Sequence, residues 1–244
     1  MNTKRYVCSV GLLTTLLLTA LLAACGDTPT AVPTPTPTVA PPSARDIAAK
    51  TADRLKEVNS LHFIVDIKSG EVNLYNNISF KRAEGDYSKP DKYRAKLRVS
   101  VAIAQVDAET VGIGDKQWLL LKNLSNNWVE LPPNVGFKAS ILFDPDKGLG
   151  AIVNKTKDLQ IVGSETLDGV DVYHLKGIVS GPDIAPITAS TLGKNDVNFD
   201  VWTGKSDYLV RQVTFKEISD SPTASDWQLN FSKFDQPVDI KSPV

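Results

Sequence analysis

The sequence predicts an α+β fold, in which one large, curved antiparallel sheet of about eleven strands carries a few helices on its concave face. Two observations lead to this prediction. From residue 61 to residue 231, most segments alternate apolar and polar residues with a period of two, which is typical of strands with one buried face. No crossover is long enough for a regular alternation of strands and helices. So many twisted strands curl, and inserted helices can then cover the concave side.

The first 24 residues are predicted to be a secretory signal. Two basic residues precede an apolar run over residues 10–22, which is too short to span roughly 30 Å of hydrocarbon. Ala23 and Ala24 then lead directly into Cys25, and this run resembles a bacterial lipobox. The resemblance implies that Cys25 begins the mature chain, carries a diacylglycerol and holds the protein on the outer face of a membrane. The alternative is an ordinary export signal with an incidental cysteine.

Residues 25–42 are predicted to form a lipidated stalk. They consist almost wholly of Thr, Pro, Ala and Val and cannot build a core. Such a composition favours polyproline II, which at roughly 3.1 Å per residue reaches about 50 Å. The stalk would lift the domain at residues 43–244 off the bilayer.

Composition and charge exclude several classes of function. Of the 27 basic residues two lie in the predicted signal, and 28 acidic residues remain, so the mature chain is slightly acidic. No basic cluster indicates nucleic-acid binding. Cys8 leaves with the signal and Cys25 takes the lipid, so we expect no disulfide and no cysteine-ligated metal. His62 and His174 lie on separate predicted strands and are expected to be strand residues at the edge of the core. We therefore expect no metal site and no cofactor.

Residues 43–58 are predicted to form the first helix. Ser43 is a suitable N-cap, Asp46 stands three residues later as in a capping box, and apolar residues recur at helical spacing. From residue 61 to residue 131 the period of two predicts successive antiparallel strands. Among them, the Gly114-Asp115 pair marks a tight hairpin turn.

The middle of the chain is predicted to interrupt the sheet twice with helices. Asp144 and Pro145 provide an N-cap and a first-turn proline for one helix, and a second short helix is expected over residues 186–192. Between the two, the Asp168-Gly169 pair predicts a type I′ hairpin. Three further strands complete the sheet by residue 231. In the predicted strand around residues 92–98, alternating basic residues are interpreted as a solvated face.

Several short segments match a known family pattern. These segments are Ser60-Leu61-His62-Phe63, Leu142-Phe143-Asp144-Pro145, Val201-Trp202-Thr203-Gly204, Tyr208-Leu209-Val210-Arg211-Gln212-Val213, Trp227-Gln228-Leu229-Asn230-Phe231-Ser232-Lys233-Phe234 and Pro237-Val238-Asp239-Ile240. Through them the chain resembles the LppX/LprA/LprF/LprG lipoprotein family of actinobacteria, over about residues 43–243. The segments are loose sets of apolar and turn residues, and none of them is catalytic.

The resemblance implies a half-barrel with helices on its concave side, similar to the LolA and LolB lipoprotein carriers. It also implies an apolar cavity that binds acylated lipids or glycolipids and moves them within the cell envelope. We expect a monomer, with an envelope transporter as a further partner. The residues expected to line the cavity are Phe63, Val65, Leu97, Val99, Ile152, Val153, Phe199 and Val201. For any single one of them ordinary core packing is the better interpretation, so the expectation concerns their collective surface.

Two other functions are considered. A sensory or scaffolding lipoprotein would use the same fold to bind a protein partner. An envelope hydrolase would need a nucleophile with a base, or paired carboxylates. The chain contains no Gly-x-Ser-x-Gly elbow and no His-Glu-x-x-His run, so we expect no catalytic residue and no enzyme.

Overall fold

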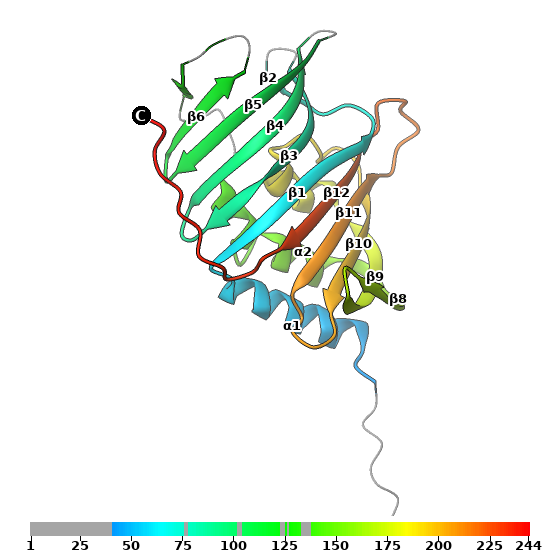
Figure 1. Ribbon diagram of the computed structural model, residues 1–244. Coiled ribbons are helices and arrows are strands. Elements are labelled where there is room, and N and C mark those ends of the chain that lie inside the picture. The colour runs from blue at the N-terminus through cyan, green and yellow to red at the C-terminus, as the bar shows by residue number, and fades with distance from the viewer. Residues whose placement is uncertain (1–40, 76–77, 102–103, 123–124, 126, 133–137) are drawn as a thin grey trace, which may run out of the picture. The chain divides into compact units, whose positions relative to one another are not determined.

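The computed structural model describes residues 41–75, 78–101, 104–122, 125, 127–132 and 138–244. Within residues 41–244, a single antiparallel sheet carries helices on one of its two faces (Figure 1). We call this the inner face and the opposite one the outer face. None of the helices in the described ranges is both long enough and apolar enough to cross a membrane.

Helix α1, Ala44–Glu57, forms where its end signals predict it. The Ser43 hydroxyl accepts a hydrogen bond from the Asp46 amide at 3.1 Å, and an Asp46 carboxylate oxygen accepts one from the Ser43 amide at 3.2 Å. This reciprocal capping box satisfies two backbone donors that the first turn would otherwise leave free. Ile47 and Leu55 are buried on the apolar stripe of the helix. The predicted first helix is confirmed.

Within the described ranges, twelve strands form the sheet. They are β1 (Ser60–Ser69), β2 (Asn73–Tyr75), β3 (Ile78–Ser88), β4 (Lys92–Val101), β5 (Ala104–Ile113), β6 (Lys116–Leu121), β7 (Val129–Glu130), β8 (Lys157–Leu167), β9 (Val170–Val179), β10 (Val197–Gly204), β11 (Val210–Glu217) and β12 (Asp226–Ser232).

The strand order brings the first and last long strands together. It runs β7-β6-β5-β4-β3-β1-β12-β11-β10-β9-β8, with β2 paired to β3 beside this path. Figure 1 shows β1 beside β12 in the middle of the sheet. Every described pairing is antiparallel. The predicted large antiparallel sheet with helices on one face is therefore confirmed.

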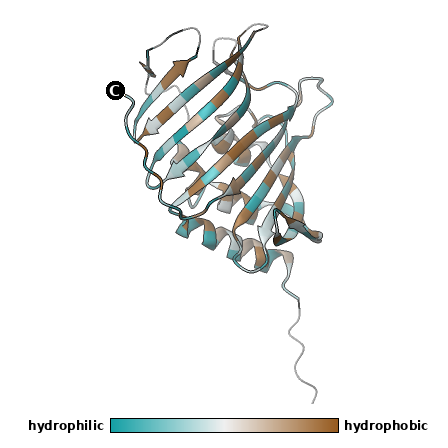
Figure 2. Ribbon diagram, in the orientation of Figure 1, coloured by the Kyte–Doolittle hydropathy of each residue, from teal (hydrophilic) through white to brown (hydrophobic). Residues whose placement is uncertain are grey.

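The hairpin between β8 and β9 turns where the sequence predicts it. Asp168 and Gly169 have φ angles of 48° and 80°, as both central residues of a type I′ turn require. Along the strands, hydrophobic and hydrophilic residues alternate (Figure 2). This alternation separates an apolar inner face from a largely polar outer face.

The helices in the middle of the chain differ from those predicted. Helix α2, Leu149–Lys155, begins after Gly148, whereas Asp144 follows the 3-10 helix η1, Ala139–Phe143. The Asp144 carboxylate accepts hydrogen bonds from the amides of Asp146 and Lys147, both at 2.9 Å. Asp144 thus stabilises a turn and does not cap the helix. The prediction of a helix cap is wrong, because an Asp before Pro is suited to a turn as well as to a helix start.

The second predicted helix is also displaced. Instead of residues 186–192, the chain forms a short helix α3, Gly181–Ile184, followed by the 3-10 helix η2, Ala185–Thr188. Pro186 lies within the first turn of η2, where a missing amide hydrogen costs little. The proline therefore marks the interior of a longer helical segment and not its beginning.

Candidate functional site

A row of apolar side chains crosses the inner face from one end of the sheet to the other. Cross-strand pairing aligns one such residue on each of ten strands. From β6 to β8 the row is Leu121, Ala108, Leu97, Ala83, Val65, Leu229, Val213, Val201, Leu175 and Ile161. This row of the inner face is thus apolar across ten strands, and the exposure of its side chains differs from strand to strand.

The half of this face formed by β9–β12 is sealed. Leu175, Val201 and Val213 have no solvent exposure, and Leu229 is only 6% exposed. Residues of α1 and α2 belong to the same buried cluster as these strand residues. We call this part of the sheet the sealed half. It is a packed core.

The other half, formed by β1 and β3–β6, retains partly exposed apolar side chains on the same inner face. We call these residues together the open apolar face. They are Phe63, Val65 and Ile67 on β1, Leu97 on β4, Val106 on β5, and Leu119 and Leu121 on β6. The same half also contributes buried residues to the main core, both small ones such as Ala83 and large ones such as Phe80 and Tyr93. An apolar sheet face that remains partly exposed to solvent is typical of a binding surface.

The 3-10 helix η1 packs beside the open apolar face. Its residues Ile141, Leu142 and Phe143 are partly buried against the main cluster, and the Phe143 ring stacks on the Tyr87 ring with centroids 4.5 Å apart. Burial, with a smaller contribution from the Asp91 charge, raises the pKa of Tyr87 to about 12. The stack therefore holds η1 on a dry part of the inner face.

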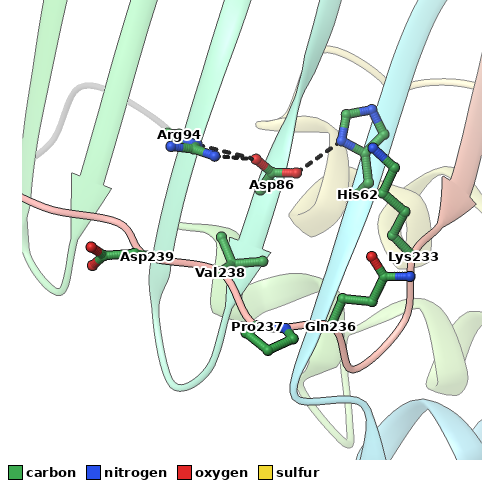
Figure 3. A pocket seen from close by; sticks show the side chains of 8 residues that line it. All are labelled: His62, Asp86, Arg94, Lys233, Gln236, Pro237, Val238 and Asp239. Atoms are coloured by element: carbon green, nitrogen blue, oxygen red, sulfur yellow. Dashed lines mark hydrogen bonds and ion pairs between the residues drawn. The ribbon is translucent and has the colours of Figure 1, made fainter.

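Two hollows lined by described residues lie elsewhere. The smaller, of about 50 Å³, is lined by residues of α1, η1 and α2, including Leu55 and Phe143. The larger, of about 320 Å³, lies on the outer face and is lined mainly by polar residues (Figure 3). Neither hollow is the apolar chamber that the sequence leads us to expect. The open apolar face is therefore the candidate site for a lipid.

The structure divides the eight expected lining residues into two groups. Phe63, Val65 and Leu97 belong to the open apolar face. The remaining five are buried in the main cluster, with solvent exposures of 3% or less. They are Val99, Ile152, Val153, Phe199 and Val201. A lining role for any of the eight stays a prediction.

Four residues of the open apolar face are missing from the expected set: Ile67, Val106, Leu119 and Leu121. The two leucines belong to the run 118–121, which is apolar on both faces of β6. Such a run hides the period of two that separates inner from outer positions. Strand pairing identifies the inner positions, because Leu119 lies opposite Thr110 and Leu121 opposite Ala108.

Each histidine lies on the outer face beside carboxylates from neighbouring strands. His62 Nδ1 is 2.9 Å from Asp86 Oδ1, and His174 Nε2 is 2.7 Å from Asp200 Oδ1. The sequence does not reveal these pairs, because 24 and 26 residues separate the partners. No group of three or more potential metal ligands occurs among the described residues. Cys25 lies outside the described ranges, so its lipidation stays a prediction.

The chain is similar to known lipoproteins. A model of the LppX_LprAFG lipoprotein family matches residues 43–240. Lipoprotein LprA of Mycobacterium tuberculosis is 36% identical over 98 residues, which cover 37% of this chain and 40% of LprA. The chain thus spans about two fifths of the length of the LprA relatives that it matches.

Two longer matches have names that refer to lipids. LprF of Mycobacterium bovis, whose name refers to diacylated glycolipid transport, is 24% identical over 183 residues, covering 73% of this chain and 67% of LprF. The lipoarabinomannan carrier protein LprG of Mycobacterium bovis is 22% identical over 232 residues, covering 92% of this chain and 94% of LprG.

Two crystal structures share the fold. LprF from Mycobacterium bovis superposes with a TM-score of 0.66 at 18% identity, over 82% of this chain and 96% of LprF. LppX from Mycobacterium tuberculosis superposes with a TM-score of 0.59 at 18% identity, over 81% of this chain and 98% of LppX. At 18% identity this likeness establishes the architecture alone.

Proposed function

Since the chain belongs to the LppX_LprAFG lipoprotein family, we propose that it is a membrane-anchored extracytoplasmic lipoprotein that binds an acylated lipid or glycolipid and carries it within the cell envelope. The observation that carries this proposal is the open apolar face. It offers partly exposed apolar side chains beside a core that is already sealed.

The free energy of exposing an acyl chain explains why a carrier is needed. At roughly 0.8 kcal/mol per methylene, a chain of about 15 methylenes costs on the order of 12 kcal/mol to expose to water. A protein surface that shields the chain removes most of this barrier to transfer between sites. Shielding requires no reacting side chain, so carriage needs no catalytic residue.

The acyl chains would lie between the sheet and η1. Leu97, Leu119 and Leu121 would form the floor on the inner face, and η1, whose Ile141 and Leu142 are partly buried, would border it on the side of β3 and β4. Binding would cover the partly exposed side chains of this face and could shift η1, which borders it. The core of β9–β12 would keep its packing, since Leu175, Val201 and Val213 have no solvent exposure.

The names of relatives support the kind of ligand. LprF is named for diacylated glycolipid and LprG for lipoarabinomannan, and both names denote lipids with carbohydrate headgroups. We carry over only the shared chemistry, an acylated lipid or glycolipid. The predicted signal, the lipidated Cys25 and the stalk at residues 25–42 would keep the carrier, as a monomer, near its membrane and near an envelope transporter that loads it.

Lipid extraction and uptake test the proposal. The full chain with Cys25→Ser would be purified, its bound lipid identified by mass spectrometry, and its uptake of a fluorescent phospholipid measured. Val65→Asn places an amide on the open apolar face and should weaken uptake by about tenfold. Ile64→Asn is the matched control, because Ile64 is the next residue on β1, is also partly exposed and lies on the outer face.

A second pair of variants repeats the comparison on β6. Leu119→Asn should weaken uptake, and Leu120→Asn should leave it unchanged, because these adjacent, partly exposed residues lie on opposite faces. Protein that is consistently free of lipid and takes up no offered phospholipid would contradict carriage. Equal losses for both members of each pair would remove the open apolar face as the site.

The packed sealed half favours the second candidate, a scaffolding or sensory lipoprotein. Such a protein would need an exposed apolar patch and no lipid. Cross-linking in cells that yields one dominant protein partner, together with lipid-free purified protein, would support this function over carriage.

A further inference from the structure

Residues 233–240, which we call the tail, run from the end of β12 across the outer face (Figure 1). The tail is held at its beginning by the start of β1. The Asn59 amide donates to the Asp235 carboxylate at 2.7 Å, and the Asp235 amide donates to the Ser60 carbonyl at 2.8 Å. The Ser60 hydroxyl donates to the Gln236 carbonyl at 2.5 Å.

The tail is also held at its far end. Ile240 is 5% exposed and packs with Val111 and Trp118 on the outer face of β5 and β6. Val238 is partly buried against the same cluster. With both ends fixed, the intervening residues bridge the polar outer positions of β1, β3 and β4.

The larger hollow, of about 320 Å³, lies beneath this bridge. Figure 3 shows His62, Asp86 and Arg94 on the strands, with Lys233 and Gln236 reaching in from the tail. The hollow lies on the outer face, opposite the open apolar face, and the proposed lipid carriage does not use it.

One carboxylate holds both His62 and Arg94 in the hollow. Asp86 Oδ1 lies 2.9 Å from His62 Nδ1, and Asp86 Oδ2 accepts from Arg94 Nε at 3.1 Å and Nη2 at 2.9 Å. Arg94 Nη1 has no hydrogen-bond partner in the described part of the chain. Asp86 therefore positions the guanidinium and leaves its Nη1 amino group available.

Of the two remaining charged residues in the hollow, Asp239 is paired within the described part of the chain and Lys233 is not. The Asp239 carboxylate lies 2.8 Å from the Lys241 ammonium, so it is already compensated. Lys233 forms no ion pair with any of the described residues. The Gln236 side chain adds a neutral amide donor to the same lining. An ammonium, a guanidinium and an amide thus border a space whose two carboxylates are both paired.

We propose that this hollow binds a compact phosphate group. An arginine held by a carboxylate presents planar donors suited to phosphate oxygens, and a lysine adds a point charge. The ligand is a phosphate ester or free phosphate, because the volume admits a small group and the apolar wall consists only of Pro237 and Val238. A phospholipid headgroup and a soluble phosphate ester share this chemistry.

Calorimetric titration of the full chain with Cys25→Ser, using inorganic phosphate, tests the site. Saturable binding is expected, and Lys233→Gln and Arg94→Gln should each weaken it by about tenfold or more. Arg98→Gln is the matched control: Arg98 lies on the same face of β4, is 54% exposed against 55% for Arg94, and pairs with one aspartate. No saturable binding, or an equal loss with Arg98→Gln, would overturn the proposal.

Two further probes distinguish the source of the phosphate. A flotation assay measures binding of the protein to vesicles that contain phosphatidylglycerol. If Lys233→Gln abolishes this vesicle binding and glycerol phosphate competes with it, the ligand is a lipid headgroup. If glycerol phosphate binds and vesicles do not, the ligand is a soluble ester. Lys233→Gln lies in the exposed tail and should keep the circular dichroism spectrum and the phospholipid uptake of the parent. Failure of the phosphate site is thus separable from failure of lipid carriage.

Discussion

Val65 and Leu229 lie directly opposite each other on the inner face of adjacent strands β1 and β12, yet Leu229 is 6% exposed and Val65 is partly exposed. Along this row of the inner face, the side chains change from buried to partly exposed between these two residues. This change coincides with the contact between the first and last long strands of the sheet. A core on one side of this contact can hold the fold while the other side binds a ligand.

Truncating a residue of the sealed half should destabilise the protein strongly. Phe199 has no exposure and stacks on Phe215 with ring centroids 5.5 Å apart. We expect Phe199→Ala to lower the free energy of unfolding by about 3–5 kcal/mol, since it leaves a cavity in a filled core. Leu119→Ala on the open apolar face should cost about 1 kcal/mol or less. Denaturant unfolding followed by circular dichroism measures both; equal costs would show that the two halves are packed alike.

A close approach of two strands predicts a second large effect. A Cβ at Gly85 on β3 would lie 2.0 Å from the Arg94 carbonyl oxygen on β4, so the backbone would have to shift. We expect Gly85→Ala to lower the free energy of unfolding by about 1–3 kcal/mol.

Gly163 on the edge strand β8 is the matched control for Gly85. A Cβ there meets no atom within 4 Å, and Gly163→Ala should be neutral or stabilising by up to about 1 kcal/mol. A Gly85→Ala variant as stable as Gly163→Ala would show that β3 and β4 lie farther apart than described.

The sequence predicts the elements well where the signal is local. Alternation identifies the strands, the Ser43–Asp46 pair identifies the start of α1, and the Asp168-Gly169 pair identifies its hairpin. In each case the residues that predict the element also form it: Ser43 and Asp46 make the capping box, and Asp168 and Gly169 make the turn. The signal at Asp144 fails, because the same residue type stabilises a turn and caps a helix.

The candidate site is harder to predict, because its exposure depends on distant contacts. Phe63 and Phe199 are both aromatic residues at inner positions of strands, yet one is partly exposed and the other is buried, because residues distant in the sequence pack on them differently. The polar hollow is likewise invisible in the sequence, since it exists only where the tail crosses β1, β3 and β4. Residues such as His62 and Arg94 become neighbours of Lys233 through this crossing.

Two aspartates should give opposite slopes of stability with pH. Burial raises the pKa of Asp86, but the hydrogen bonds from His62 and Arg94 outweigh it, and the net pKa is lowered from 3.8. Burial raises the pKa of Asp226 above 3.8, and the charges of Lys216 and Lys68 offset this only in part. Asp86 therefore stabilises the fold at pH above its unfolded value, and this contribution is lost as the pH falls through the lower folded value. Asp226 behaves in the opposite way, because its ionised form is disfavoured in the folded state.

Thermal unfolding between about pH 3 and pH 7 checks both signs. Asp86→Asn should lower the Tm at neutral pH and flatten its fall toward acid, while Asp226→Asn should leave the neutral Tm equal or higher. A Tm that falls equally in both variants at neutral pH would contradict the assigned environments.

Photo-cross-linking with a phospholipid that carries a diazirine at its acyl terminus tests the central claim most directly. The labelled lipid is offered to the full chain with Cys25→Ser, and mass spectrometry then identifies the modified residues. We predict modification on the inner face of β1 and β4–β6, at residues such as Phe63, Leu97 and Leu119, and protection by unlabelled lipid. Modification confined to the outer face, or none above background, would contradict binding at the open apolar face.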